Sequence, residues 1–385
     1  MEPQRQAIIG SVLLLLLCSW QVSAAETKIQ IRRVPNGGVQ PQVDVDAKGV
    51  VHLVYLSGDP SHTDVSYSRS TDGGATWTSP IRVNSQPGSA LSIGTVRGAQ
   101  MAVGRDGHVY VAWMGSSIAE PQAPRGLAPM LFSRLSDDGK SFEPQRNLIT
   151  SHPGLDGGGS VAADRAGNVF VAWHAPAVVK GTEQDRRVWI ARSSDDGKTF
   201  TPEIPISSSD SGACGCCGMR ISAGDGKVVA LYRGAAEQVN RGMRLIETST
   251  DLRHPRDREI DPMKFGACIM STAAFGWNAN NVLMAWESKG QVFWSPVDGN
   301  SVYPHPAPGD GNNRKHPALV CDRDGNVLLA WTEGTGWNKG GSLAWQLFDA
   351  SGNAIPDADG QRRDLPAWDS PAAFCGSDGT ITILY

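Results

Sequence analysis

The chain has 385 residues, among them 44 glycines and 24 prolines, and a formal net charge of −4. Its charges are spread without a basic block, which argues against nucleic acid as a partner. Glycine and proline interleaved with short apolar runs predict many strands and tight turns and few helices.

The N-terminus predicts an export signal. Arg5 precedes the apolar segment 7–18, and small residues follow up to Ala24 and Ala25. This order is typical of a secretory signal peptide cleaved near Ala24 or Ala25. The apolar segment is also shorter than the roughly 20 residues that a membrane-spanning helix needs.

We therefore expect residues 1–25 to be removed and residues 26–385 to form one domain, secreted or periplasmic and without a transmembrane segment. A lipoprotein anchored through Cys18 is the alternative. The ordinary cleavage pattern is preferred because the large Leu17 stands where a small residue is expected before a lipidated cysteine.

One pattern recurs seven times along the rest of the chain. Each copy is an apolar run, a turn rich in Asp, Gly and Asn, and an alternating run that usually ends in an aromatic residue. Glycine and asparagine supply the positive φ of a tight turn, so each copy is predicted to be a β-hairpin. The spacing of about 45 to 60 residues is expected of propeller blades. The copies occupy residues 41–55, 99–113, 159–173, 219–232, 271–286, 316–331 and 370–385.

A second pair of strands is predicted after each of the first six hairpins. In the first three units its turn reads SRSTDGGATW (68–77), SRLSDDGKSF (133–142) and ARSSDDGKTF (191–200). A Ser/Thr and Asp pair can cap the turn backbone, Gly takes the tight position, and the final aromatic packs into the blade. The turn residues are Asp72, Gly74 and Trp77, then Asp137, Gly139 and Phe142, then Asp195, Gly197 and Phe200.

The two ends of the chain predict how the ring closes. The sequence ends on the second strand of the seventh hairpin, while residues 27–34 form a strand with no hairpin before it. Pairing that strand into the last blade would remove an exposed edge. We predict an all-β propeller of four-stranded blades, seven in number with an incomplete last blade; six blades are the alternative.

The three turns resemble the Asp boxes of sialidases and related bacterial neuraminidase repeat (BNR) proteins, which form β-propellers. The resemblance implies an arginine triad on a sugar carboxylate, a tyrosine nucleophile assisted by a glutamate, and an aspartate acid or base. This chain departs from it, because the Arg-Ile-Pro motif is absent and no tyrosine is an evident nucleophile. Another glycan-directed hydrolase or lyase on the same scaffold is equally open.

Strand order assigns residues to the two rims of the propeller. The hairpin turns and the Asp-box turns share one rim, here the turn rim, and the remaining loops share the opposite loop rim. On the loop rim, Glu287 and Glu333 are candidate acid or base groups. Arginine and histidine side chains there could bind an anionic or polar glycan; they are Arg97, Arg220, Arg233, Arg314, His174 and His316.

Loop ends are polar wherever they meet solvent, even where no ligand binds. The same residues therefore fit two alternatives, a binding site or ordinary solvent-exposed loops. Aromatic residues that close the second strands recur at one repeat position, which favours packing between blades over ligand stacking. They are Tyr55, Trp113, Trp173, Tyr232, Trp286, Trp331 and Tyr385.

Cysteines cluster before the fourth hairpin, in GACGCCGMR (212–220). A Cys214–Cys268 disulfide is favoured for a secreted chain, with Cys216 and Cys217 as a vicinal disulfide or as thiols. The alternative is a copper(I) or zinc site made by all four, and no other cofactor is expected. This stretch also resembles a secreted bacterial subgroup with a Cys-x-Cys-Cys motif, to which no firm activity is attached.

Three functions follow from these patterns. The first is a secreted sialidase-like propeller that acts on or binds a polar or anionic glycan at the loop rim. The second is a non-catalytic propeller that binds a glycan or a protein. The third is a thiolate metal protein, which would bind copper or zinc at the cysteine cluster.

Overall fold

The computed structural model describes residues 28–155, 157–267, 269–278, 281–297, 301–311 and 313–385. The expected signal peptide, with Cys18, and Cys268 lie outside these residues. Helices in the described part are four single 3₁₀ turns, beginning at Pro35, Arg105, Pro124 and Glu183. None of the described helices has the length and apolar character needed to cross a membrane.

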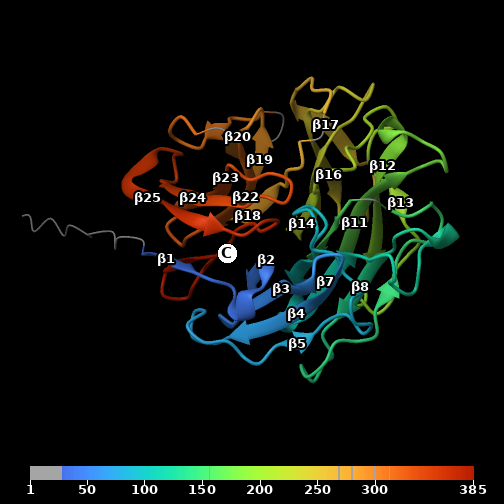
Figure 1. Cartoon of the computed structure of the whole chain (residues 1–385), viewed down its shortest axis with the longest axis horizontal. Coiled ribbons are helices and arrows are strands. Elements are labelled where there is room, and N and C mark those ends of the chain that lie inside the picture. Colours follow the sequence, from blue (N-terminus) through green and yellow to red (C-terminus); the bar gives the residue numbers. More distant parts are fainter. Residues whose placement is uncertain (1–27, 156, 268, 279–280, 298–300, 312) are drawn as a thin grey trace, which may run out of the picture.

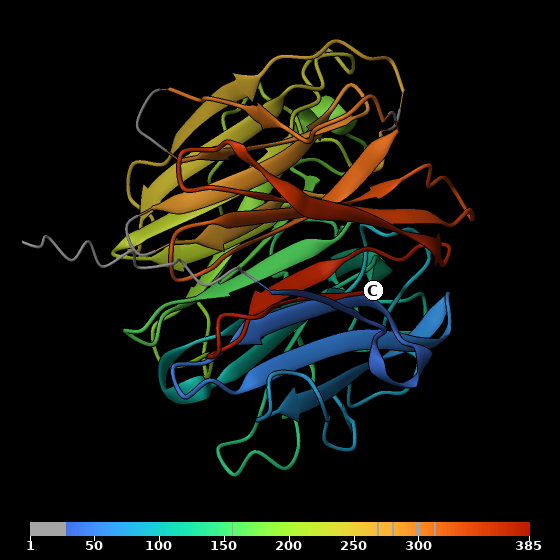
Figure 2. The same ribbon diagram turned by 90° about the vertical axis from the view of Figure 1, so that its left-hand side faces the viewer.

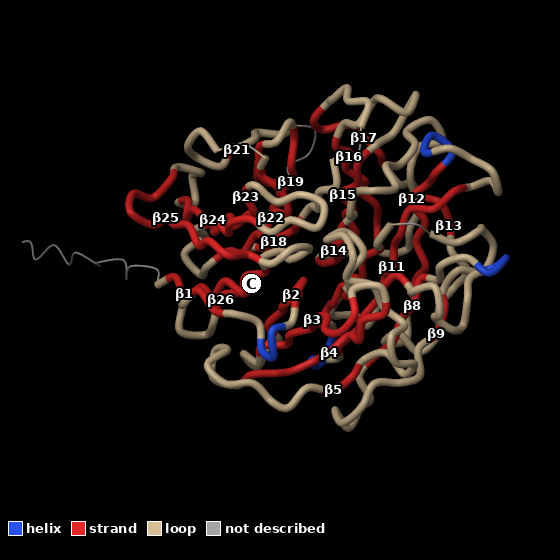
Figure 3. Tube along the Cα trace, in the orientation of Figure 1, coloured by secondary structure: helices blue, strands red, loops and turns tan. Residues whose placement is uncertain are grey.

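Seven sheets are arranged as blades around a central axis, each with its first strand innermost (Figures 1 and 3). Within each of the first six blades, four antiparallel strands follow chain order. Blades one to three consist of β2 (Val39–Val45), β3 (Val51–Asp59), β4 (His62–Ser70) and β5 (Ile81–Arg82); β6 (Gln100–Val103), β7 (Val109–Met114), β8 (Met130–Arg134) and β9 (Arg146–Asn147); β10 (Gly159–Ala163), β11 (Val169–Pro176), β12 (Arg186–Ser193) and β13 (Ile204–Pro205). Blades four to six consist of β14 (Arg220–Gly224), β15 (Lys227–Arg233), β16 (Met243–Ser249) and β17 (Arg256–Asp261); β18 (Ala274–Trp277), β19 (Val282–Ser288), β20 (Gln291–Pro296) and β21 (His305–Pro306); β22 (Arg314–Cys321), β23 (Val327–Glu333), β24 (Gly341–Phe348) and β25 (Ala354–Leu365).

Blade seven is closed by the N-terminal strand. It contains β26 (Ala372–Cys375), β27 (Ile381–Leu384) and β1 (Ile29–Arg32), and β1 pairs with β27 in parallel. The side view shows β1, in blue, beside the red C-terminal strands (Figure 2). The prediction of seven blades closed by the N-terminal strand is confirmed, and the six-bladed alternative is wrong.

The hairpin turns have the backbone geometry that their composition predicts. Between β6 and β7, Asp106 and Gly107 have φ of 59° and 82°. Glycine adopts such angles without a steric penalty, and aspartate tolerates the left-handed region better than most residues. The innermost strand β6 can therefore be joined to β7 by a tight turn on the turn rim.

Aromatic residues that close the second strands are packed between blades, as the repeat predicts. Trp173 of blade three, for example, lies in one cluster with Phe132 of blade two, and Tyr55 of blade one lies with Phe374 of blade seven. Because each aromatic fills a different interblade cluster, these side chains stabilise the ring. All seven are at most 4% exposed: Tyr55, Trp113, Trp173, Tyr232, Trp286, Trp331 and Tyr385.

Two of the three turns predicted to be Asp boxes are capped by the aspartate. The Asp72 carboxylate accepts hydrogen bonds from the Thr76 amide at 2.9 Å and from its hydroxyl at 2.6 Å. The Asp195 carboxylate accepts the same pair from Thr199, at 2.9 and 2.6 Å. Each carboxylate thus satisfies groups of its own turn, as aspartate commonly does.

The second of these turns is built differently. Leu135 stands where the other two turns have Ser70 and Ser193, so no hydroxyl is present at that position. Asp138 caps this turn instead, accepting from the Ser136 hydroxyl at 2.6 Å. Asp137 bonds to Arg134 at 3.0 Å, so its predicted role in the turn is taken by its neighbour.

The final aromatics of these turns contact the preceding blade as well as residues of their own blade. Phe142 of blade two meets Tyr67 of blade one edge-on at 5.5 Å. Phe200 of blade three meets Phe132 of blade two at 4.9 Å. Trp77 lies in the cluster between blades one and seven. These turns therefore stabilise contacts around the ring.

Candidate functional site

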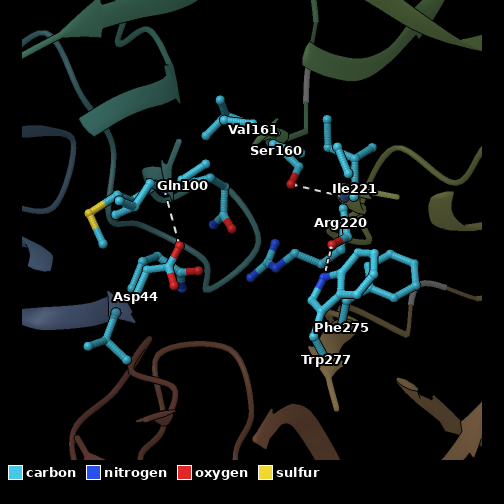
Figure 4. A pocket seen from close by; sticks show the side chains of 18 of the residues that line it. Asp44, Gln100, Ser160, Val161, Arg220, Ile221, Phe275 and Trp277 are labelled. Carbon is cyan, nitrogen blue, oxygen red and sulfur yellow. Dashed lines mark hydrogen bonds between the residues drawn. The ribbon is translucent and has the colours of Figure 1, made fainter. Parts of the chain in front are cut away.

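A cavity of about 1100 Å³ lies on the axis of the propeller, enclosed by the innermost strands of all seven blades. Its lining extends from the hairpin turns, for example Asp46 and Asp106, to the first residues of β6 and β14. Those first residues are Gln100 and Arg220, and Arg220 was predicted to bind a ligand. Figure 4 shows part of this lining from close by.

Arg220 carries a positive charge into this cavity. Its side chain is half-buried, and Nη1 donates to the carbonyl of Met219 at 3.0 Å. No ion pair to Arg220 is found among the described residues. Burial lowers the pKa of the guanidinium to about 10, because the loss of solvation disfavours its charged form. The position suits an anionic group supplied by a ligand.

Asp44 of β2 faces Arg220 from the other side of the cavity (Figure 4). Its carboxylate accepts from the backbone amides of Val45 at 2.8 Å and Val103 at 3.2 Å. Burial raises the pKa of Asp44 to about 6, although the two amides oppose the shift. The sequence reasoning missed this residue, although the alternation of QVDVD (42–46) could have indicated a side chain directed towards the axis.

Hydroxyl and aromatic groups complete the wall around Arg220. The Ser160 hydroxyl accepts from the Ile221 amide at 3.1 Å, and Trp277 Nε1 donates to Ser222 at 2.7 Å (Figure 4). Phe275 also lines the cavity. A wall that combines apolar rings with a few oriented polar groups is typical of a small-ligand site.

His316 also lines the cavity, because β22 contains a bulge at this point. The register shifts between Lys315 and Ala318, and His316 has a φ of 52°. Its ring is buried, and Nδ1 has no hydrogen-bond partner among the described residues. Burial lowers its pKa to about 3, so the imidazole is neutral near pH 7. Two of the predicted binding residues, Arg220 and His316, thus line one cavity.

Arg233 and Glu287 form a buried ion pair instead of lining the cavity. Arg233 Nη2 lies 2.8 Å from Glu287 Oε2, and both side chains are 2% exposed. The guanidinium also donates to the carbonyls of Arg241 and Glu287, at 2.9 and 2.6 Å. Burial raises the pKa of Glu287, while Arg233 opposes the shift. The contacts join blades four and five.

Arg314 and Glu333 are paired in a similar way at blade six. Arg314 Nε lies 2.9 Å from Glu333 Oε1, and the guanidinium stacks over Trp331 at 5.1 Å. Glu333 also accepts from Trp331 Nε1 at 2.9 Å and from Gln361 at 2.9 Å. Neither Glu287 nor Glu333, the predicted acid or base groups, is among the residues that line the cavity.

The last two predicted binding residues lie elsewhere on the loop rim. Arg97 and the ring of Trp337 both lie close to Gly94. A side chain at position 94 would bring its Cβ to 3.0 Å from Arg97 Nη1 and 3.2 Å from that ring. Trp337 is 53% exposed and meets Trp368 at 6.1 Å. His174 is buried, with Nε2 3.0 Å from the carbonyl of Cys217.

Three thiols meet beside His174. Cys214 Sγ lies 3.3 Å from Cys216 Sγ and 3.5 Å from Cys217 Sγ. All three are free thiols. Hydrogen bonds from Cys214 and Cys216 lower the pKa of Cys217. Cys268, the expected disulfide partner of Cys214, lies outside the described residues, so that bridge stays a prediction.

Comparison with known proteins places the fold. No family model matches the chain, and no curated protein matches it. A protein of unknown function from Dyadobacter fermentans is similar, with a TM-score of 0.57 and 16% identity over 83% of this chain and 96% of that chain. An α-L-arabinanase of Penicillium chrysogenum complexed with arabinobiose has a TM-score of 0.52 and 14% identity, covering 83% and 95%. A Trypanosoma rangeli sialidase with the inhibitor DANA has a TM-score of 0.51 and 13% identity, covering 81% of this chain and 56% of that one.

The protein is therefore a seven-bladed β-propeller with a sialidase-like fold. Sequence identities of 13 to 16% support a fold shared with these proteins, but they do not show that the chemistry is shared.

Proposed function

We propose that the protein binds an acidic saccharide in its central cavity, with Arg220 holding the carboxylate or sulfate of the sugar. The observation that carries this proposal is the half-buried Arg220, which has no ion pair among the described residues. A buried charge without a partner is costly, so an anionic ligand would be strongly favoured at this position. Guanidinium also matches the planar geometry of a carboxylate.

The rest of the wall supports a sugar as the ligand. Ser160 and Gln100 offer polar groups, and the ring of Trp277 offers an apolar face. Two solved structures of similar fold, an arabinanase complexed with arabinobiose and a sialidase with the inhibitor DANA, support a saccharide as the ligand. That likeness supports the ligand class without specifying the sugar.

The tyrosine route of sialidases is not part of the proposal. Among the described residues that line the cavity, none is a tyrosine. Tyr232 and Tyr67, for example, are fully buried between blades. Burial raises the pKa of Tyr67 to about 12. Such a phenol is a poor nucleophile near neutral pH.

Asp44 favours a second candidate function, glycosidic bond cleavage. A carboxyl with a pKa of about 6 can hold or release a proton near neutral pH, as a general acid or base must. Its position opposite Arg220 would put it near a bound acidic sugar. Cleavage would require that it reach the glycosidic oxygen or a ring proton of that sugar.

Binding is tested by calorimetric titration of the protein with sialic acid, glucuronic acid and a sulfated hexose, with galactose as the neutral counterpart. We expect an acidic sugar to bind and Arg220→Met to weaken it at least about tenfold, because a charged hydrogen bond contributes about 1.5–3 kcal/mol. Arg323→Met is the matched control, since Arg323 is exposed on a hairpin turn outside the cavity. Equal binding by Arg220→Met would refute the proposal.

Cleavage is tested on oligosaccharides of whichever acidic sugar binds. If Asp44 transfers a proton, Asp44→Asn abolishes release of reducing ends and leaves binding within about threefold, since general acid–base catalysis contributes about 100- to 10,000-fold. If the native protein releases no product, the protein is a binding module and the second candidate is rejected.

A further inference from the structure

The loop between β13 and β14 gathers three sulfur atoms at one point of the loop rim. The Sγ atoms of Cys214, Cys216 and Cys217 all lie within 4.8 Å of one another. Cys214 and Cys217 are 1% and 3% exposed, while Cys216 is half-buried. Two sulfurs therefore point into the protein, and the third leaves a route to solvent.

Three blades hold this loop in place. The Cys214 amide donates to the Arg233 carbonyl of blade four at 2.9 Å, and the Gly218 amide donates to the Ser271 carbonyl before blade five at 2.9 Å. The Gly215 amide donates to Glu183 Oε1 of blade three at 2.9 Å. The thiols are thus positioned by the fold before any ligand arrives, which reduces the entropic cost of binding.

We propose that these three cysteines form a trithiolate site for a copper(I) ion. A metal about 2.3 Å from each sulfur requires sulfur–sulfur distances of about 3.8 to 4.0 Å. The observed distances of 3.3 and 3.5 Å, with the third no more than 4.8 Å, need changes of only about an ångström or less to meet this requirement. Thiolates are soft ligands that favour copper(I).

The number of donors distinguishes copper(I) from zinc. Structural zinc sites are almost always tetrahedral with four protein ligands. Among the described residues, the only group of three or more candidate ligands whose donor atoms lie this close consists of these three cysteines. Three sulfurs satisfy a trigonal ion without a fourth donor.

A disulfide is the competing use of the same residues. It would require one pair of sulfurs to approach to about 2.05 Å and would leave the third thiol unused. Cys216 and Cys217 are adjacent, so a bridge between them would also strain the backbone. The export expected from residues 1–25 makes this competition chemically relevant, because secretion exposes thiols to oxidation.

The surroundings suit an anionic metal centre. The Arg233 and Arg241 guanidinium groups interact electrostatically with Cys217 and Cys214. Arg241 is anchored in turn by Glu183, at 2.5 Å. On the inner side, an apolar layer that includes Ala235, Met263 and Ile269 limits access of water. Three thiols that bind the ion would release three protons to solvent, leaving a centre of charge −2 beside Arg233 and Arg241, which are also paired with Glu287 and Glu183.

The site is tested by anaerobic titration of the reduced protein with copper(I) in competition with bicinchoninate. We expect one ion per chain, a higher Tm once the site is filled, and an X-ray absorption spectrum with three sulfur neighbours at about 2.3 Å. Cys214→Ser should weaken binding more than about 100-fold, because loss of an outer-shell partner alone costs about 10- to 100-fold.

Cys216→Ser provides a second variant that does not disturb the buried side of the loop, and it should weaken binding to a similar extent. Cys321→Ser, which removes a free thiol of blade six, is the control and should leave binding unchanged. Copper binding that survives both cluster variants would overturn the proposal. So would preference for zinc(II) in the same titration, or a native protein isolated with two of these thiols already oxidised. Saccharide binding through Arg220 is an independent measurement, so either proposal can fail alone.

Discussion

Arg220 and Arg233 lie in the same blade but in opposite electrostatic situations. Arg220 begins β14 and Arg233 ends β15, so both lie at the loop-rim end of adjacent strands. Arg233 is paired with Glu287 at 2.8 Å, whereas Arg220 donates to a backbone carbonyl and points into the cavity. Sequence alone assigned both to ligand binding.

The difference shows which buried charges belong to the fold and which are left for a ligand. A buried charge costs free energy unless it is paired and hydrogen-bonded. Arg233 meets this condition through Glu287 and two carbonyls, so its contribution is structural. Arg220 does not, and the unfavourable desolvation of its charge would be relieved by an anion.

The largest expected effect comes from breaking the paired arginine. Arg233→Met leaves the Glu287 carboxylate buried without its cation, which should lower the free energy of unfolding by about 3–5 kcal/mol. Urea denaturation of the purified variant at pH 7 would measure the loss. The double variant Arg233→Met/Glu287→Leu removes both charges and should recover most of it. A single variant as stable as the native protein would show that the pair is not structural.

Asp369 resembles Arg220 in its situation, although its charge is opposite and the two do not form a pair. It is a buried carboxyl for which no ion pair is found among the described residues. It is 2% exposed and accepts from the Gln40 and Ser370 amides at 2.7 and 2.9 Å. Burial raises its pKa from 3.8 to about 6, although the two amides oppose the shift. Between these values the folded state binds a proton that the unfolded chain has released. The stability that Asp369 contributes is therefore fully present below pH 3.8 and is lost as the pH rises to about 6.

Asp369→Asn should remove this pH dependence. Relative to the variant, the native protein should lose up to about 1.4 kcal/mol of unfolding free energy per pH unit in that window, and about 3 kcal/mol in all. Denaturation curves at pH 4, 5, 6 and 7 measure the slope. Parallel pH profiles of native protein and variant would mean that Asp369 titrates normally.

The repeat made the fold predictable from sequence. Seven hairpin patterns, their spacing and the unpaired N-terminal strand gave the number of blades and the closure through β1. The parallel pairing of β1 with β27 was not predicted, because composition does not encode strand direction. In the second turn Asp138 is the capping residue in place of the predicted Asp137. Leu135 stands there where the other two turns have a serine, and the prediction did not take this difference into account.

The candidate site was less predictable, since partners decide the role of each charge. Arg220 and His316 reach the cavity as candidates, and Asp44 was missed. Arg314 was predicted, like Arg220, to bind a ligand at the loop rim, but it is paired in register with Glu333, ahead of the bulge in β22. A bulge shifts the register by one residue without a clear sequence signal. Beyond it, a prediction of which face of the sheet each side chain occupies is wrong.

Arg220→Met gives the smallest expected change in stability and therefore the sharpest contrast with Arg233→Met. Removing a charge without a carboxylate partner leaves no orphaned anion, and the apolar side chain keeps much of the arginine's contact with the wall. The free energy of unfolding should stay within about 1 kcal/mol of the native value. Urea denaturation of the two variants side by side provides the measurement. If Arg220→Met were as damaging as Arg233→Met, Arg220 would have a structural partner, and its assignment as the anion anchor of the cavity would lose its basis.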